Sequence, residues 1–353
     1  MPRLPTRVLG AAGALAVLAL AGPASARIMP VFDAREQLAA AEAVVRGRIV
    51  DLRDLGPAAD PYGGGPARRM LAAVTVDVVV KGPVAPGPLA IALLTNPPAA
   101  PVIDGLPIYS KGETYLFFLK RGAEHWELVH HDLGARAAVT TTVRPDGALT
   151  DPTARLLSLY ALSLPGAEYA VAIEALDGLG ALGGPAAAAA ARGATTAPNP
   201  DVRAHAFAAC IRAGDADVIP DAVRFIETAD PKIHFSGQPQ HWVRLAIGAY
   251  ATAAAITTLH GLLRHRDEPL RLEVARALRR LRSKASVFFL AHALDDASRE
   301  VRYVVVQALA EILGKSGDWA PAMGDAARED RATALWKKWW ATEGEARFSR
   351  KVY

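Results

Sequence analysis

The chain has 353 residues, a formal net charge of +4, a hydrophobic content of 51% and a single cysteine, Cys210. This length is enough for two domains, and one cysteine excludes an intramolecular disulfide. The weak net charge does not indicate a nucleic acid partner, which a strongly basic surface would bind.

The first residues have the three-part layout of a secretory signal peptide. Two arginines precede an apolar run of about 14 residues, whereas a helix needs roughly 20 to cross a bilayer. Ala24-x-Ala26 then offers a cleavage site that leaves Arg27 as the mature N-terminus. We therefore predict a signal peptide over residues 1–26, cleaved after Ala26, and a periplasmic or secreted protein with no membrane span after cleavage. The alternative is an uncleaved membrane anchor.

Residues 27–150 are predicted to form a β-rich domain. A short helix over residues 34–43, capped by Asp33, runs into a β-branched segment at 44–50. After a loop over residues 56–66, valines alternate along a long second strand at positions 74, 76, 78 and 80. Further strands are predicted over residues 89–94, 112–119, 126–129 and 137–143, with a proline-rich loop over 96–107. Five or six strands without interleaved long helices predict a small antiparallel barrel or sandwich.

Three stretches of this domain, AEAVVRGRIVDL, VTVDVVVKG and GETYLFFLKRG, resemble the netrin-like and metalloproteinase-inhibitor group of OB-type β-barrels. The resemblance covers roughly residues 34–142 and implies an OB-like fold. Members of that group that inhibit metalloproteinases chelate the zinc with an N-terminal cysteine. The mature start here is Arg27-Ile28-Met29-Pro30, so the resemblance does not imply that mechanism.

Residues 151–353 are predicted to form an α-helical solenoid. The apolar period changes from two to between three and four, and alanine and leucine replace valine. Helices over residues 153–164 and 168–179 begin the stack. A helix over residues 326–341 ends it, with tryptophans at 336, 339 and 340 spaced to cap the last repeat.

One helix pattern recurs four times in this region, beginning at Val202-Arg203, Val243-Arg244, Leu270-Arg271 and Val301-Arg302. Small or apolar residues follow each arginine at the third, sixth and seventh positions, which lie on one face of a helix. The last copies, DEPLRLEVARALRRL and DASREVRYVVVQALAEILG, resemble HEAT repeats of the bacterial short type. The resemblance implies a stack of two-helix repeats.

In that family, an aspartate of the turn within the repeat and the arginine of the second helix form a stacked polar ladder. The resemblance therefore implies that Arg203, Arg244, Arg271 and Arg302 are structural. Asp201 with Arg203 and Asp296 with Arg302 fit the pattern. Glu268 replaces the aspartate before Arg271, and none precedes Arg244, so the copy at Val243 is predicted to be the weakest.

The candidate chemical motifs favour structural interpretations. The glycines at 178, 180 and 183 match a dinucleotide-binding spacing, but they follow a helix where that motif needs a strand. The group His125, His130, His131 and Asp132 lies on one strand, whose neighbours face opposite ways. His260 and His265 lack zinc-pair spacing, there is no G-x-S-x-G elbow, and Cys210 occupies a core position. We therefore predict no catalytic residue, no cofactor and no metal.

A basic stretch in the third repeat copy offers a candidate binding face, at Arg276, Arg279, Arg280 and Arg282. Such a face would suit a protein partner with an acidic surface, and the alternative is an ordinary solvated helix face. We therefore predict an exported, non-enzymatic binding or scaffold protein. The alternatives are an enzyme regulator with a protease-inhibitor-like β domain, or a lyase of the kind found among bacterial short HEAT proteins.

Overall fold

The computed structural model describes residues 33–59, 66–95, 108–131, 135–137, 144–230, 232–233 and 237–349. Phe32–Tyr353 form one compact unit. The predicted signal peptide, the predicted loop over 96–107 and most of the strand predicted over 137–143 lie outside the described residues.

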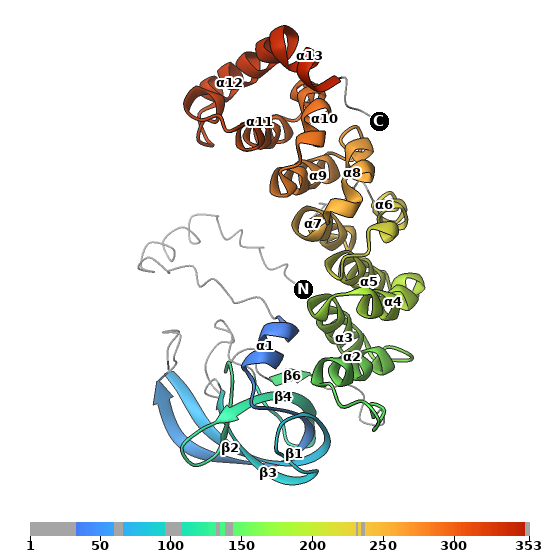
Figure 1. The fold of residues 1–353 in the computed structure, drawn as a ribbon. Helices are drawn as coiled ribbons and strands as arrows, with labels where there is room; N and C mark the ends of the chain where they lie inside the picture. The colour runs from blue at the N-terminus through green and yellow to red at the C-terminus, as the bar shows by residue number, and fades with distance from the viewer. Residues whose placement is uncertain are drawn as a thin grey trace, which may run out of the picture. The chain divides into compact units, whose positions relative to one another are not determined.

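The N-terminal region is a small β-barrel (Figure 1). Its strands are β1 (Ala43–Ala59), β2 (Pro66–Lys81), β3 (Gly87–Thr95), β4 (Thr114–Arg121), β5 (Trp126–Leu128) and β6 (Ala135–Ala137). They follow the order β1-β2-β3-β5-β4-β6, and a further pairing of β1 with β4 closes five of them into a ring. The predicted barrel is thereby confirmed with one correction. β3 and β5 pair in parallel, so the barrel is mixed and not purely antiparallel.

The hairpin of β1 and β2 is longer than predicted. The predicted loop over residues 56–66 is partly strand, because Gly56 pairs with Arg69 and Ala59 pairs with Pro66. Gly56 has a φ of +106°, a conformation open to glycine but strained for other residues, and it lies at an irregularity in the pairing. Gly56 therefore marks an irregularity within β1, at the position where the sequence pattern predicted the end of the strand.

A β-bulge divides the predicted valine alternation between two cores. Arg46 lies opposite Val78 and the next residue lies opposite Val76, so Asp77 is the extra residue. A bulge shifts the side-chain alternation by one. Val76 accordingly packs inside the barrel, whereas Val78 and Val80 pack outward against the helices.

The helical region consists of pairs of helices in two layers (Figure 1). Its helices are α2 (Pro152–Ser163), α3 (Tyr169–Leu182), α4 (Pro185–Arg192), α5 (Pro200–Arg212), α6 (Ile219–Ile226), α7 (Gln240–Tyr250), α8 (Ile256–Leu262), α9 (Glu268–Leu281), α10 (Val287–His292), α11 (Arg299–Leu313), α12 (Ala326–Trp339) and α13 (Glu345–Phe348). The second helices of the pairs, α3, α5, α7, α9 and α11, contact one another in sequence order and form one layer. The predicted helical solenoid is thereby confirmed.

A short helix, α1 (Ala34–Ala40), joins the barrel to the first repeats. Asp33 caps it as predicted and also pairs with Arg212 of α5, at 3.2 Å between Oδ2 and Nη2. Arg35 donates to the carbonyl of Leu182 at the end of α3. The other end of α1 receives a hydrogen bond from Lys81 of β2. These contacts attach the start of the described chain to both regions.

The outer face of the barrel is buried under these helices. One hydrophobic cluster contains Val44 of β1, Val78 of β2 and Phe118 of β4 together with Leu156 and Tyr160 of α2. On the same outer face Arg46 is fully buried, and its guanidinium makes two hydrogen bonds to Asp77, at 3.0 and 2.5 Å. The bulge places Asp77 where its carboxylate can offset this buried charge.

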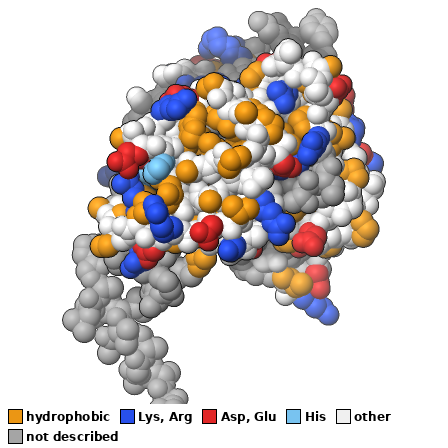
Figure 2. Space-filling view, turned by 90° about the horizontal axis from the view of Figure 1, so that it is seen from below, with side chains coloured by type: hydrophobic (Ala, Val, Ile, Leu, Met, Phe, Trp, Pro, Cys, Tyr) orange, Lys and Arg blue, Asp and Glu red, His pale blue; other side chains and the backbone are white. Residues whose placement is uncertain are grey.

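The face seen from below carries a mixed surface (Figure 2). Hydrophobic side chains are interspersed there with lysine, arginine, aspartate and glutamate, and no single charge predominates in this view. Exposed hydrophobic residues scattered among charges are normal on a soluble surface. This view therefore gives no reason to place a charged binding site on that face.

Candidate interaction surface

The four predicted repeat arginines lie near the start of four neighbouring helices of one layer, α5, α7, α9 and α11. Three of them donate through Nη1 to the carbonyls six and five residues before them. These pairs are Arg203 with Ala197 and Pro198, Arg271 with His265 and Arg266, and Arg302 with Asp296 and Ala297. Each arginine thus fixes the turn that leads into its own helix.

The carboxylate partners of the ladder differ from those that the resemblance implied. Arg244 makes two hydrogen bonds to Asp267, at 3.0 and 2.7 Å. Arg271 likewise makes two to Asp296, at 2.7 and 2.9 Å. Each arginine therefore pairs with the aspartate of the following repeat, and the implied pair of Asp296 with Arg302 is a contact to the Asp296 backbone instead. The ladder joins neighbouring repeats.

The copy predicted to be the weakest has a complete ladder bond, because Asp267 supplies the carboxylate that Arg244 needs. Asp267 also caps α9 by accepting from the backbone of Leu270 at 2.8 Å. Arg244 differs from the other three arginines in its Nη1. Arg244 is buried, and this nitrogen has no hydrogen-bond partner among the described residues.

The first predicted pair, Asp201 with Arg203, is not formed. Arg203 lies over the ring of Phe225, with 5.4 Å from its Cζ to the ring centroid. The following helix, α7, begins after Pro239, where the later repeats have an aspartate or serine cap. No aspartate stands before α7 in the place that Asp267 and Asp296 take before α9 and α11, and among the described residues Arg203 contacts an aromatic face instead.

Electrostatics favour the charged form of the ladder. Burial alone would raise the pKa of Asp296, but hydrogen bonds from Arg271 and the Ser298 backbone, with the charges of Arg271 and Arg302, lower it overall. The hydrogen bond to Asp296 raises the pKa of Arg271 against the opposing effect of its burial. Both groups therefore stay ionised, and two parallel hydrogen bonds between them fix the register of α9 and α11.

The four arginines of the predicted basic face contact α11, the end of α7 and their own helix α9. Arg279 and Arg282 contact Glu311 of α11, at 2.8 Å from Nε and 3.2 Å from Nη2. Arg280 donates to the last carbonyls around α7, those of Gly248 and Ala251. Arg276 pairs with Glu273 at 2.5 Å. Each is thus engaged within the stack, and an acidic partner for this face stays a prediction.

A different group of side chains crosses three helices of the same layer. We define the Trp242 patch as Asp177 of α3, His205 of α5, and His241 and Trp242 of α7. His205 Nδ1 lies 3.0 Å from Asp177 Oδ1, and the His205 ring centroid lies 6.1 Å from that of Trp242. The Trp242 side chain is 51% exposed. The patch therefore presents a half-exposed indole beside an imidazole that a carboxylate holds in place.

The glycines with dinucleotide-like spacing serve helix packing. Gly178 and Gly180 lie inside α3, so the helix continues past the predicted end at residue 179, and Gly183 caps it with a φ of +68°. A Cβ at Gly178 would overlap the Tyr160 ring, and one at Gly180 would lie 3.0 Å from the Cα of Ala209. The two inner glycines allow α2 and α5 to approach α3 closely.

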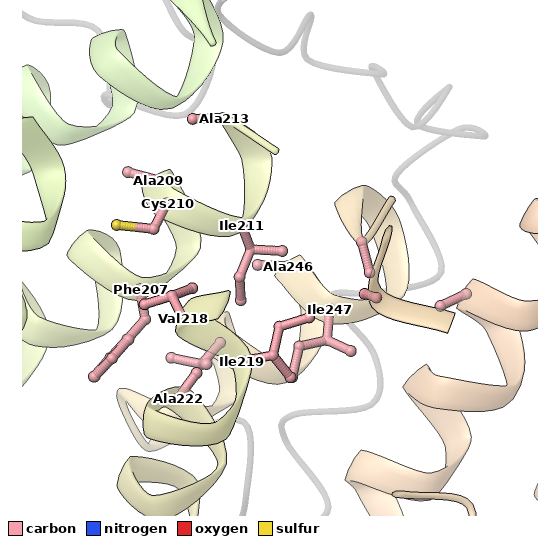
Figure 3. Packing of buried hydrophobic residues seen from close by; sticks show 14 of the residues in the cluster. Phe207, Ala209, Cys210, Ile211, Ala213, Val218, Ile219, Ala222, Ala246 and Ile247 are labelled. Atoms are coloured by element: carbon pink, nitrogen blue, oxygen red, sulfur yellow. The ribbon is translucent and has the colours of Figure 1, made fainter. Parts of the chain in front are cut away.

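Cys210 lies in the hydrophobic packing of α5, as predicted (Figure 3). Figure 3 shows it beside Ala209, with Phe207 on the same helix. Burial and the nearby Asp215 charge raise the pKa of its thiol to about 12. The thiol therefore stays protonated and is not a nucleophile at neutral pH.

His260 and His265 make separate contacts. His260 is buried and stacks on Phe289, with ring centroids 3.9 Å apart, while its Nε2 lies 3.0 Å from Ser286 Oγ. His265 contacts Glu227 and the backbone of Asp267. Asp132 lies outside the described residues. In the described part of the chain, no three histidine, cysteine or acidic side chains are grouped so that they could hold a metal ion.

The C-terminal tryptophans pack against the last repeat. Trp336 is fully buried and donates from Nε1 to the carbonyl of Trp319 at 2.8 Å. Trp339 is buried, and Trp340 lies near Phe288 and His292 of α10. Trp336 and Trp339 therefore serve packing at the end of the stack.

Within the described ranges, no single helix is both long and apolar enough to cross a membrane. The adjoining helices Gln240–Tyr250 and Ala253–Leu262 meet the requirement only when taken together, and they are bent by 109°.

Comparison with known families agrees with the geometry. The model of the HEAT repeats family matches residues 234–310, which contain α7 to α10 and most of α11. The chain therefore carries HEAT repeats. No curated protein matches it. HEAT repeats are typical of protein-interaction scaffolds, because the stacked helices present an extended surface.

Two features of the HEAT surface were absent from the sequence analysis. Asp267 has no predicted role, although an aspartate before the proline-started helix α9 matches a capping signal. Trp242 adjoins the recurring Val243-Arg244 pattern, so its place on a repeat helix could have been noted. Its neighbours Asp177 and His205 come from other repeats, and only the stacking brings them together.

Proposed function

We propose that this chain is an exported, non-enzymatic binding protein in which the helix layer of α3, α5 and α7 holds a protein partner at the Trp242 patch. The observation that most supports this proposal is the exposure of Trp242. Its side chain is 51% exposed on a HEAT-repeat helix and lies next to the oriented His205. Tryptophan is enriched among the residues that dominate binding energy at protein interfaces.

The contact of His205 Nδ1 with Asp177 Oδ1 supports this proposal, because it holds two members of the Trp242 patch together across α3 and α5. The ladder bond of Arg244 with Asp267 fixes α7, which carries Trp242, to the repeat that follows. A preorganised surface loses less conformational entropy when a partner binds. The non-enzymatic part of the proposal rests on the sequence, which contains no H-E-x-x-H pair and no G-x-S-x-G elbow.

Site-specific photo-crosslinking in the producing cell tests the binding surface. A photoreactive phenylalanine analogue at position 242 is expected to give a discrete partner adduct, which His205→Ala reduces. The same analogue at exposed Thr257 on α8, in the other layer, is the matched control. Equal adducts at both positions, or none at 242, would contradict the proposal.

Export is tested separately by cell fractionation. The full chain is expected in the periplasm or medium as a product that starts at Arg27, and a variant with Leu15→Arg in the apolar run is expected to stay in the cytoplasm. N-terminal sequencing of the exported product checks the cleavage position. Cytoplasmic retention of the unaltered chain would contradict export without touching the binding proposal.

A further inference from the structure

The last helix, α12, forms one wall of a groove of about 650 Å³. The facing wall is the segment from Gly317 to Ala322 that leads into the helix. The floor contains apolar side chains from both walls, namely Ala320, Pro321, Ala322, Ala334 and Leu335. The groove therefore has an apolar floor and lies at the end of the HEAT stack.

The two walls are held in place from behind. Gln307 of α11 donates to the carbonyl of Pro321 at 2.8 Å, and Trp336 donates to the carbonyl of Trp319 at the same distance. Ala332 and Trp336 on the opposite side of α12 are fully buried against the stack. Because each wall is fixed by a buried contact, the groove does not have to form when a ligand arrives.

The rim of the groove is cationic. Arg331 and Lys338 have no side-chain hydrogen bond or ion pair with any residue that the structure describes. Arg328 is 70% exposed and contacts Asp325 at 3.2 Å. Among the described residues that line the groove, Asp318 is the one carboxylate. This distinguishes α12 from α9, where each arginine of the predicted basic face already has a partner.

We propose that this groove docks an acidic amphipathic helix of a partner protein, with its apolar stripe on Leu335 and its carboxylates at Arg331 and Lys338. Apolar anchors in a groove with complementary charges at the rim are a general mode of helix recognition. A basic segment would be repelled by the same rim. The proposal is independent of the Trp242 patch, which lies on other helices.

Fluorescence anisotropy with two synthetic peptides tests this assignment on the mature chain. The first is an amphipathic helix with leucine at i, i+3, i+4 and i+7 and glutamate elsewhere, and the second replaces each glutamate with lysine. The acidic peptide is expected to bind, more weakly as salt rises. Arg331→Glu with Lys338→Glu is expected to weaken binding about tenfold or more. The basic peptide is expected not to bind the unaltered chain.

A matched control changes the same number of charges away from the groove. Lys232→Glu with Lys284→Glu alters two exposed lysines and is expected to leave binding unchanged. Leu335→Asp is expected to abolish binding, and circular dichroism checks that this variant folds. Equal binding by the double reversal at the rim, or no binding of the acidic peptide, would overturn the proposal. So would binding to phosphatidylglycerol vesicles through Arg331 and Lys338 without binding to the peptide.

Discussion

The barrel and the HEAT stack are held together by contacts of different range. β1 closes the barrel by pairing with β4, so Ala43 lies opposite Leu119. In the stack, the ladder bonds join residues of consecutive repeats, as in Arg244 with Asp267. Long-range pairing forms as a unit, whereas a solenoid is stabilised by nearest-neighbour interfaces. A destabilising substitution in the barrel should therefore unfold more of the structure than a substitution within one repeat.

The barrel and the HEAT stack are not fully separate, because they share one hydrophobic cluster. The outer faces of β1, β2 and β4 provide the surface on which α2 packs. The first repeat thus has the barrel in place of a preceding repeat, and a solenoid needs such a cap at its end. The buried pair of Arg46 and Asp77 lies on this outer face, so it contributes to both regions.

Removing Arg46 is expected to have the largest effect. Arg46→Ala leaves the half-buried Asp77 carboxylate without its partner and deletes the fully buried methylenes of Arg46. We expect a loss of about 3 kcal/mol in the free energy of unfolding, measured by urea denaturation. Arg68→Ala, which breaks an exposed pair with Asp54 on the same hairpin, should have a much smaller effect, because water screens that pair. Similar losses for both variants would show that burial does not set the difference.

A glycine in the stack gives the next largest effect. Gly178→Ala places a Cβ against the buried Tyr160 ring between α2 and α3, and we expect a loss of about 2 kcal/mol. The control is Gly261→Ala on α8, where a Cβ meets nothing within 4 Å. That variant should gain about 0.5 kcal/mol, because alanine has less freedom to lose on folding. If Gly178→Ala is also stabilising, the close approach of α2 to α3 does not depend on a glycine at position 178.

The fold could be predicted from the sequence where the signal is local. Alternating valines gave the strand, and the recurring Val-Arg pattern gave the second helix of four repeats. The parallel pairing of β3 and β5 and the bulge at Asp77 could not be predicted, because each depends on the partner strand. The same alternation at Val76 and Val78 would have placed both side chains in one core.

The ladder and the candidate site were predictable only in part. The four arginines were identified, but their carboxylates were assigned within a repeat, whereas the stack pairs Arg271 with Asp296 of the next one. The charge count on α9 could not show that Glu311 lies beside Arg279. The Trp242 patch and the α12 groove combine residues from separate segments, and such proximity exists only after packing.

The stack also contains a buried histidine that links stability to pH. Burial lowers the pKa of His260, while the unfolded chain titrates near about 6.5. As the pH falls below about 6.5, the unfolded state takes up a proton that the folded state resists, so stability decreases. His260→Gln should flatten this decrease between about pH 7.5 and about pH 5.5, measured as the urea midpoint.

Glu273 provides an internal check on that result. Burial raises its pKa, against the opposing effect of Arg276, so its folded form takes up a proton before the unfolded one. It therefore adds stability as the pH falls through its folded pKa, the opposite sign to His260. If the slope of stability against pH is unchanged in both His260→Gln and Glu273→Gln, the pH dependence of stability comes from other groups.

The smallest expected effect concerns the ends of α9 and α11, which occupy equivalent places in consecutive repeats. Arg282 caps α9 with a φ of +49°, whereas Gly314 caps α11 with a φ of +66°. Arg282→Gly removes the steric cost of the left-handed conformation and loses an exposed ion pair with Glu311. We expect a net gain of about 0.5 kcal/mol by thermal denaturation. The opposite change at the end of α11, Gly314→Ala, should cost about 1 kcal/mol. Nothing lies within 4 Å of the added Cβ, so only the strain of the left-handed backbone contributes. A loss for Arg282→Gly would mean that its pairing with Glu311 outweighs the strain, and that α9 uses arginine where α11 uses glycine in order to hold the next repeat.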